Sequence, residues 1–323
     1  MFETWYGIVL FVLLCIVGIV LIAAFLFFLT SIIVFNITLV RTKKTKWSRA
    51  CSQKNPEQIG MYNNGVKWAE ENESHRKSLH IVNEGYNLYG EYFDFGYDRA
   101  VILVPGRQEG GPYGYYFLQA YPAHGYNILT IDQRAHGLSD GRYNCLGFEE
   151  HKDLLAWCKL LHDEFGNNSI ILHGICIGSS CAMMAMLSDD CPDYIDALIA
   201  EGMYTTFYES YKNHLIEFKK PVAVMPLINM WLRLCTGHSM TKGNIHMIDK
   251  FEKPLLMIHS KEDEYSLAKD AVVLYDMCPS KNKEIVWYEH GSHSKLRLVD
   301  SEKYDSSIIS FLERNVKKDT VTE

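Results

Sequence analysis

The sequence predicts an α/β protein with a mostly parallel, eight-stranded sheet, helices on both faces of that sheet and a transmembrane helix in front of it. Short apolar or alternating stretches, suited to strands, alternate with amphipathic stretches, suited to helices, over most of the 323 residues. One strand and one helix flank the turn 174–178, GICIG, whose central residue is Cys176. An uncharged run from Thr4 to Val40 precedes these features. In sheets of this class, active groups gather at the carboxyl ends of the strands.

The uncharged run predicts a membrane anchor over residues 1–40. It exceeds the roughly 20 apolar residues that cross a bilayer, so we expect a tilted single helix, with a hairpin of two short helices as an alternative. A cleaved secretory signal is disfavoured because no basic segment precedes the run and no small-residue cleavage site follows it. Only Glu3 lies before the run, whereas basic residues follow it directly. This asymmetry predicts a single-pass protein whose body faces the cytoplasm.

Residues 41–77 are expected to form a basic juxtamembrane segment and a linker with a weak helical pattern around Trp68. The stretch from Arg41 to Lys54 holds six basic and no acidic residues. Such a stretch can contact anionic lipid headgroups, or it can be a solvated flank that fixes the topology. The whole chain has a net charge of −7, so the remainder is strongly acidic. An acidic body argues against nucleic-acid binding.

The nine cysteines are irregularly spaced, odd in number and without a CxxC pair. This pattern is typical of reduced thiols in a reducing compartment and gives little support for a metal site. No metal and no cofactor are therefore expected. The sequence pattern does not set an oligomeric state.

The strands and helices are expected from about residue 78 onward. Strands are predicted at 78–82, 86–93, 100–104, 126–131, 169–173, 195–200, 254–259 and 284–288, and helices at 113–123, 149–165, 180–187, 267–277 and 304–314. The stretch 204–250 is too long for a single crossover helix and is rich in Tyr, Met, Trp and Leu. It predicts a helical cap that shapes an apolar pocket, or else extra helices packed at the sheet edge.

The turn at Cys176 has the form of a nucleophile elbow with a thiol at its centre. Gly174 and Gly178 allow the helix to pack close to the strand while the central residue takes a strained conformation. Cys176 is then expected at a helix N-terminus, where free N–H groups and the helix dipole favour a thiolate. A buried structural cysteine between chance glycines is the alternative for this turn taken alone.

A cysteine nucleophile needs a base and a group that orients the base, both from loops after later strands. Asp263 follows the strand 254–259, and His293 follows the strand 284–288. We therefore predict a triad in the order Cys176, Asp263, His293. His290 competes with His293, and Glu201, Glu262 and Glu264 compete with Asp263.

An oxyanion needs backbone N–H donors aimed at the developing negative charge. The turn after Cys176 supplies the N–H of Ile177. The glycine-rich loop after the strand 100–104 supplies a second candidate, the N–H of Arg107. Taken by itself, that loop is equally well explained as a flexible connector.

Several segments resemble the α/β-hydrolase superfamily. Residues 132–141, DQRAHGLSDG, look like its D-x-R-G-H-G-x-S-x-G segment, and residues 147–154 resemble the helix opening that follows, whose acidic residues are structural. The loops around Asp263 and His293 are similar to its acid and histidine loops. Within the superfamily, the chain resembles membrane-anchored bacterial hydrolases of the serine aminopeptidase or esterase type. The resemblance implies an α/β-hydrolase domain over residues 78–318 with its cap at about 204–250.

Two positions depart from that resemblance. The family usually has serine at the elbow and histidine-glycine at the oxyanion loop, where this chain has Cys176 and Pro105-Gly106. A minority resembling dienelactone hydrolase uses cysteine in a G-x-C-x-G elbow. The expected activity is hydrolysis of an ester or thioester, with a small-molecule or lipid-like acyl compound as the substrate. The alternatives are an acyltransferase and a non-enzymatic binding protein in which Cys176 is a remnant.

Overall fold

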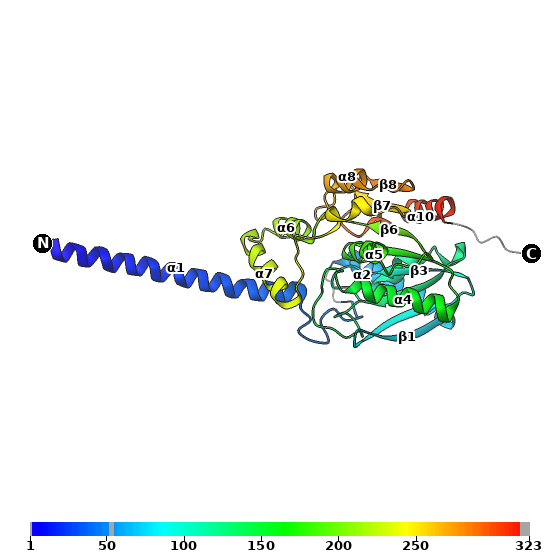
Figure 1. Cartoon of the computed structure of the whole chain (residues 1–323), viewed down its shortest axis with the longest axis horizontal. Coiled ribbons are helices and arrows are strands. Elements are labelled where there is room, and N and C mark those ends of the chain that lie inside the picture. The colour runs from blue at the N-terminus through cyan, green and yellow to red at the C-terminus, as the bar shows by residue number, and fades with distance from the viewer. Residues whose placement is uncertain (1, 52–54, 317–323) are drawn as a thin grey trace, which may run out of the picture.

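The computed structural model describes residues 2–51 and 55–316, and it contains one eight-stranded sheet (Figure 1). The strand order is β1-β2-β4-β3-β5-β6-β7-β8. The pairs β1–β2 and β2–β4 are antiparallel, and every other pair is parallel. The predicted α/β-hydrolase fold with a mostly parallel, eight-stranded sheet is therefore confirmed. Residues 317–318 of the predicted domain, and Lys54 of the basic stretch, lie outside the described residues.

The elements have the following bounds. The strands are β1 (Arg76–Asn83), β2 (Tyr86–Phe93), β3 (Arg99–Val104), β4 (Asn127–Asp132), β5 (Ser169–Ile175), β6 (Ile195–Glu201), β7 (Leu255–Ser260) and β8 (Lys283–Tyr288). The α-helices are α1 (Phe2–Leu39), α2 (Pro56–Glu71), α3 (Tyr115–Leu118), α4 (Glu150–Phe165), α5 (Ile177–Met186), α6 (Phe207–Glu217), α7 (Met225–Thr236), α8 (Ala268–Met277), α9 (Leu296–Val299) and α10 (Ser301–Asn315). Short 3₁₀ turns lie between them, of which η4 (Val222–Val224) joins α6 to α7.

The sheet buries a different apolar layer on each face, because successive side chains of a strand point to opposite sides. On β3, Ile102 packs with residues of α4, α5 and α8, whereas Leu103 packs with residues of α2, α3 and α10. Both side chains are fully buried. Helices therefore cover both faces of the sheet, as predicted, and the carboxyl ends of the strands are left to carry functional groups.

The segment at 113–123 was expected to be one helix, but only α3 within it is α-helical. A 3₁₀ turn at Gly111–Gly114 precedes α3, and another at Pro122–His124 follows it. Gly114 packs so tightly on Leu103 that a Cβ atom would overlap that side chain. Pro122 has no N–H group to continue the helical hydrogen bonds, so the chain turns there.

Residues 41–51 pack on the domain, where the sequence predicted a contact with lipid headgroups or a solvated flank. The guanidinium group of Arg41 donates hydrogen bonds to the carbonyl oxygens of Ser139, at 2.7 Å, and Gly137, at 2.5 Å. The ring of Trp47 stacks on that of His136, with 4.8 Å between their centroids. The basic stretch is therefore bound to the DQRAHGLSDG segment through its arginines, and it does not serve only as a lipid contact.

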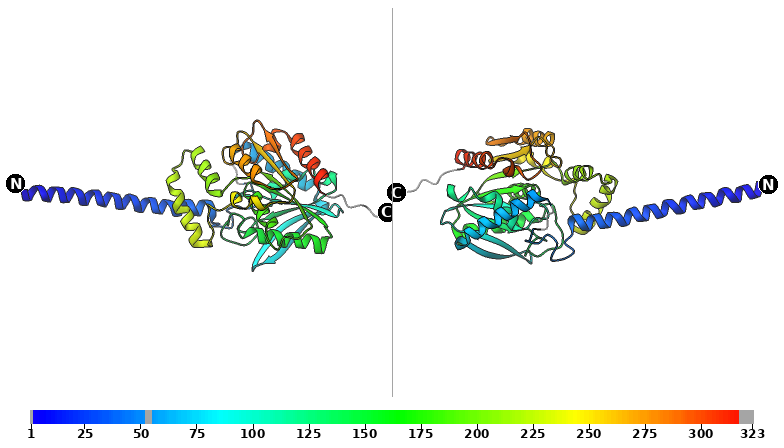
Figure 2. Two further views of the ribbon diagram at one scale, coloured as in Figure 1. Left: turned by 45° about the horizontal axis from the view of Figure 1, so that its top comes forward. Right: turned by 180° about the vertical axis from the view of Figure 1, so that it is seen from behind.

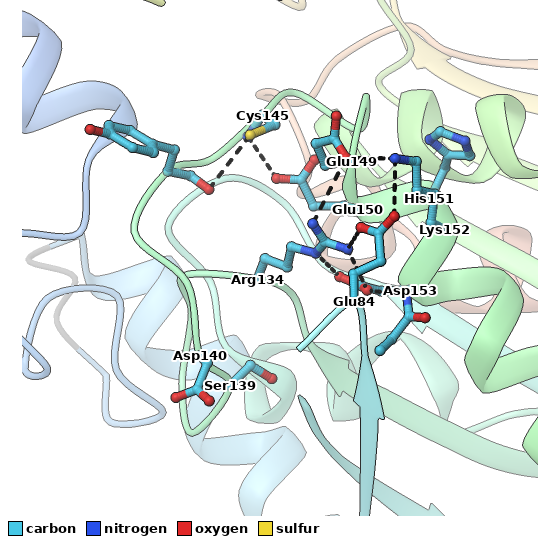
Figure 3. Close-up of polar contacts among 12 residues, drawn as sticks. Glu84, Arg134, Ser139, Asp140, Cys145, Glu149, Glu150, His151, Lys152 and Asp153 are labelled. Atoms are coloured by element: carbon cyan, nitrogen blue, oxygen red, sulfur yellow. Dashed lines mark hydrogen bonds and ion pairs between the residues drawn. The ribbon is translucent and has the colours of Figure 1, made fainter. Parts of the chain in front are cut away.

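A buried ion pair between Arg134 and Asp153 holds the start of α4 against the sheet. Arg134 donates hydrogen bonds to Glu84 at 2.6 Å and to Asp153 at 2.9 Å (Figure 3). Glu150 accepts a hydrogen bond from the N–H of Cys145 at 2.6 Å. These acidic side chains thus bind an arginine and backbone groups, which is the structural role that the resemblance implied for this region.

Helix α1 projects from the domain on the side of the cap helices α6 and α7, in all three views (Figures 1 and 2). Its stretch Trp5–Leu39 is long and apolar enough to be a candidate membrane span. Near its C-terminal end, Phe35 and Leu39 enter an apolar cluster with Ile228 and Leu232 of α7. The span and the cap are therefore packed together.

Removing Arg49 is expected to destabilise the protein. Its guanidinium group pairs with buried Glu91 and with buried Asp132, the latter at 3.1 Å. Among the described residues, the substitution Arg49→Met leaves buried Asp132 without an ion pair and buried Glu91 with only Arg76, at 3.9 Å, and should cost about 3 kcal/mol. Thermal unfolding of the detergent-solubilised protein measures this cost as a lower midpoint.

Lys67→Met provides the matched control. Lys67 pairs with Glu71 at 3.8 Å, with side-chain exposures of 74% and 60%, so its removal should cost less than about 0.5 kcal/mol. Equal shifts in the two variants would contradict the stabilising role of the buried pairs.

Candidate active site

Cys176 lies between the end of β5 and the start of α5, at the sharp turn that the sequence predicted. Its backbone has φ of 55° and ψ of −110°, a region that costs a non-glycine residue on the order of 1–3 kcal/mol. The helix begins at Ile177, closer to the cysteine than the predicted start at residue 180. Cys176 is consequently the N-cap residue of α5, and its thiol lines a cavity.

Two glycines make this turn possible. A Cβ atom at Gly174 would overlap the backbone of Ser179, and one at Gly178 would overlap the carbonyl oxygen of Val104. The same atom at Gly178 would lie 2.9 Å from the carbonyl oxygen of Pro105. The N-terminus of α5 therefore touches the backbone of the loop after β3, which brings Ile177 next to the loop that contains Arg107.

Asp263 and His293 contact each other, although they come from the loops after two different strands. His293 Nδ1 lies 2.7 Å from Asp263 Oδ2. The backbone N–H groups of Tyr265 and Ser266 donate to the other carboxylate oxygen, Oδ1, at 2.9 and 2.8 Å. Asp263 is thus held in one orientation and has one oxygen left for the imidazole.

The environment of His293 favours its protonated form. Burial lowers the pKa of His293, but the charges of Asp263 and of the Cys176 thiolate outweigh burial and raise this pKa well above its usual value. In turn, His293 and the backbone donors keep the pKa of Asp263 low in spite of burial. Within residues 2–51 and 55–316, Nε2 of His293 has no hydrogen-bond partner. His293 and Cys176 line the same cavity.

A glycine makes room for the imidazole. Gly202, directly after β6, has φ of +63°, and a Cβ atom there would lie 2.8 Å from Cε1 of His293. Larger residues are therefore excluded at this position by both backbone conformation and space.

The competing residues lie elsewhere. His290 pairs with Glu262 at 2.9 Å in solvent, where their side chains are 79% and 58% exposed. Glu201 is buried beside Tyr304, whose hydroxyl donates to it at 2.6 Å, and burial raises the pKa of Glu201 to about 7. Glu264 is exposed at the rim of the cavity. Of the predicted alternatives, only Asp263 and His293 are bonded to each other and near Cys176.

The loop after β3 leaves the N–H of Arg107 without a partner among the described residues. Pro105 has none, Gly106 donates to Glu109 Oε2 at 3.1 Å, and Gln108 donates to His136 Nε2 at 3.3 Å. The N–H of Glu109 bonds the carbonyl oxygen of Gly106. In the described chain, the N–H of Arg107 makes no such bond, which leaves it available at the position predicted for an oxyanion donor.

The cavity measures about 710 Å³ and lies between these loops and the cap. Phe207, Tyr211 and His214 line it from α6, at a spacing of four and three residues that places them on one helix face. Arg107 extends across this face, with its guanidinium group 5.5 Å from the ring centroid of Tyr211. The sequence analysis placed a cap here but did not identify this face, although the helical spacing was a usable signal.

Glu109 is a further cavity residue that the sequence analysis did not identify. It accepts the N–H of Gly106, and burial raises its pKa to about 7. Nothing in the sequence separates it from an ordinary loop glutamate. Among the described residues, no group of three or more His, Cys, Asp and Glu side chains is arranged to hold a metal ion.

Comparisons with known proteins agree with this architecture. Residues 99–222 match the alpha/beta hydrolase fold family. The protein YqkD of Bacillus subtilis is 30% identical over 193 residues, which are 58% of this chain and 63% of that protein. A membrane protein of Saccharomyces cerevisiae is 24% identical over 229 residues, which are 68% of this chain and 72% of that one. This chain therefore spans about three fifths of the length of the Bacillus relative.

Among solved structures, an esterase of Pyrococcus furiosus superposes with a TM-score of 0.64. It is 22% identical, and the superposition covers 77% of this chain and 94% of the esterase. The strand order, the turn at Cys176 and the match over residues 99–222 together show that this chain has the α/β-hydrolase fold.

Proposed function

We propose that this protein is a membrane-anchored hydrolase that cleaves a carboxylic ester or thioester through Cys176, His293 and Asp263. The observation that carries the proposal is the position of His293, whose side chain is 11% exposed. Its Nδ1 is bound to Asp263, and its unpartnered Nε2 lies at a cavity that Cys176 also lines. The likeness to an esterase of Pyrococcus furiosus supports the reaction class.

In the first step, the Cys176 thiolate attacks the carbonyl carbon and forms a carbon–sulfur bond. The N–H groups of Ile177 and Arg107 stabilise the oxyanion. The bond to the leaving alcohol or thiol then breaks, and Nε2 of protonated His293 gives its proton to that group. Amides are poorer substrates because the thiolate leaves more readily than an unprotonated amine.

The second step needs His293 as a base. Part of the high pKa of His293 comes from the charge of the Cys176 thiolate. Once the sulfur is acylated, that charge is gone and the pKa of His293 falls. The neutral imidazole takes a proton from water, the resulting hydroxide attacks the acyl carbon, and the thiolate leaves with the carboxylic acid released.

Catalytic turnover of p-nitrophenyl esters tests the triad. Cys176→Ala should lose at least about 10³-fold in kcat, because no covalent intermediate can form, while Cys176→Ser tests whether oxygen can replace sulfur. His293→Ala should fall by a comparable factor. Its matched control is His290→Ala, which removes an exposed histidine of the same loop and should leave kcat unchanged.

Alkylation by iodoacetamide gives an independent measurement of the same triad. Mass spectrometry should find Cys176 modified first at neutral pH, and more slowly in His293→Ala, because His293 stabilises the thiolate. Ester turnover that survives in Cys176→Ala would contradict the proposed nucleophile.

Stability should depend on pH through His293. A folded pKa above the unfolded value of about 6.5 gives stability that is fully present below pH 6.5 and is lost as pH rises through the folded pKa. Asp263→Asn removes the main charge that raises this pKa. Its cost in unfolding free energy should therefore be larger at pH 6.5 than at pH 10, as measured by urea unfolding. An equal cost at both values would contradict the charge interaction.

We further propose that the catalytic domain lies on the cytoplasmic side. The argument is the basic flank of α1, where Lys43 and Lys44 remain exposed. Protease added to inside-out vesicles should digest the domain, whereas right-side-out vesicles should protect it. The reverse pattern would overturn this orientation.

A further inference from the structure

The turn between α6 and α7 exposes apolar side chains that the proposed reaction does not explain. We call residues 216–222 the cap tip. Ile216 is 56% exposed, Phe218 55% and Val222 38%. Lys219 and Lys220 lie between them, both exposed, and neither forms an ion pair within the described chain. The cap tip also holds exposed Glu217, so its net charge is +1. Apolar side chains next to unpaired lysines are typical of a segment that binds at a membrane interface.

The cap is attached to the candidate membrane span. Trp231 of α7 donates a hydrogen bond to the Ser31 hydroxyl of α1 at 2.9 Å, and its ring centroid lies 5.2 Å from that of Phe28. On α6, the Tyr211 hydroxyl lies 2.6 Å from that of Thr38. These contacts place the cap beside α1, on the side from which α1 projects (Figures 1 and 2).

The length of α1 indicates where the membrane surface lies. The 35 residues of Trp5–Leu39 span about 50 Å, whereas a hydrocarbon core is about 30 Å thick. If Trp5 marks one interface, the core ends near residue 25. The cap contacts begin just beyond, at Phe28 and Ser31. The cap therefore starts at the depth where α1 leaves the bilayer.

The cap tip also leads into the cavity. Phe218 is exposed on the cap tip and lines the cavity together with Phe207 and Tyr211. A path lined by aromatic side chains, and by polar residues such as Glu217, thus runs from the outer surface of the cap toward Cys176. An acyl chain that enters the protein along this path contacts aromatic rings before it reaches the Cys176 thiol.

We propose that the cap tip rests in the interface of the bilayer that α1 crosses, where Lys219 and Lys220 contact anionic headgroups, and that the cavity takes its acyl chain from a lipid of that bilayer. The substrate class rests on the proposed hydrolase function, whereas the membrane contact does not. Ile216 and Phe218 enter the acyl region, and the lysines remain at headgroup level.

Photocrosslinking tests the membrane contact without any catalysis. The full chain is reconstituted in vesicles of phosphatidylcholine with about a third phosphatidylglycerol, a composition that gives an anionic surface. A phosphatidylcholine with a diazirine in its acyl chain is added, and labelled peptides are mapped by mass spectrometry. Label is expected on α1 and on the cap tip. The peptide of Val82, which is 73% exposed at the distant β1–β2 turn, should stay unlabelled.

Label on α1 is the positive control, because it shows that the photocrosslinking worked. An unlabelled cap tip would then overturn the proposal, and so would equal labelling of the cap tip and of the Val82 peptide. A cap tip that binds another protein instead of lipid would also remain unlabelled in vesicles of the pure chain.

Turnover tests the substrate class. Lys219→Glu with Lys220→Glu should lower hydrolysis of an ester lipid held in the same vesicles by about tenfold, since each basic residue near an anionic surface contributes substantially to binding. Hydrolysis of a short, water-soluble ester should not change. Lys269→Glu with Lys281→Glu is the matched control, because both lysines are exposed, outside the cap and without an ion pair in the described residues.

Equal loss in both double variants, or in both assays, would overturn the proposed delivery of lipid by the cap tip. If no ester of any kind is hydrolysed while the cap tip is labelled, the hydrolase function fails and the membrane contact stands.

Discussion

The close contact between the start of α5 and the backbone of β3 is the constraint on which the site depends. Gly178 touches the carbonyl groups of Val104 and Pro105, and any larger residue would push α5 away from the sheet. The close packing of α5 on β3 forces Cys176 into a strained conformation and places the Cys176 thiol at the end of β5. It also brings the N–H of Ile177 to the loop of Arg107, so that the proposed nucleophile and the proposed oxyanion donors are placed by one packing contact.

The juxtamembrane segment supports this same loop indirectly. Trp47 stacks on His136, and His136 accepts the N–H of Gln108, which fixes the loop next to Arg107. Burial lowers the pKa of His136 to about 4, so the ring stays neutral and keeps a lone pair for Gln108. The position of an oxyanion donor thus depends on residues that directly follow the membrane helix.

Features set by local chemistry could be predicted from the sequence, and features set by distant contacts could not. The eight strands follow from apolar patterning. The contact between Asp263 and His293 follows from the rule that loops after parallel strands meet at one edge of the sheet. The broken helix at residues 113–123 depends on Leu103, which lies against Gly114 from another element. No pattern within residues 41–51 reveals that Arg49 pairs with Glu91 and Asp132.

The bond between Thr38 and Tyr211 makes the candidate membrane span α1 part of the folded domain as well. Tyr211 lines the cavity, and Phe35 and Leu39 of α1 bury Ile228 and Leu232 of the cap. Burial of each such apolar side chain stabilises the protein by about 1.5–3 kcal/mol. Without α1, the cap would expose these side chains to solvent and would lose the contact that holds Tyr211. The shape of the cavity therefore depends on α1, and the position proposed for α1 in a bilayer would set how the cap meets the proposed substrate.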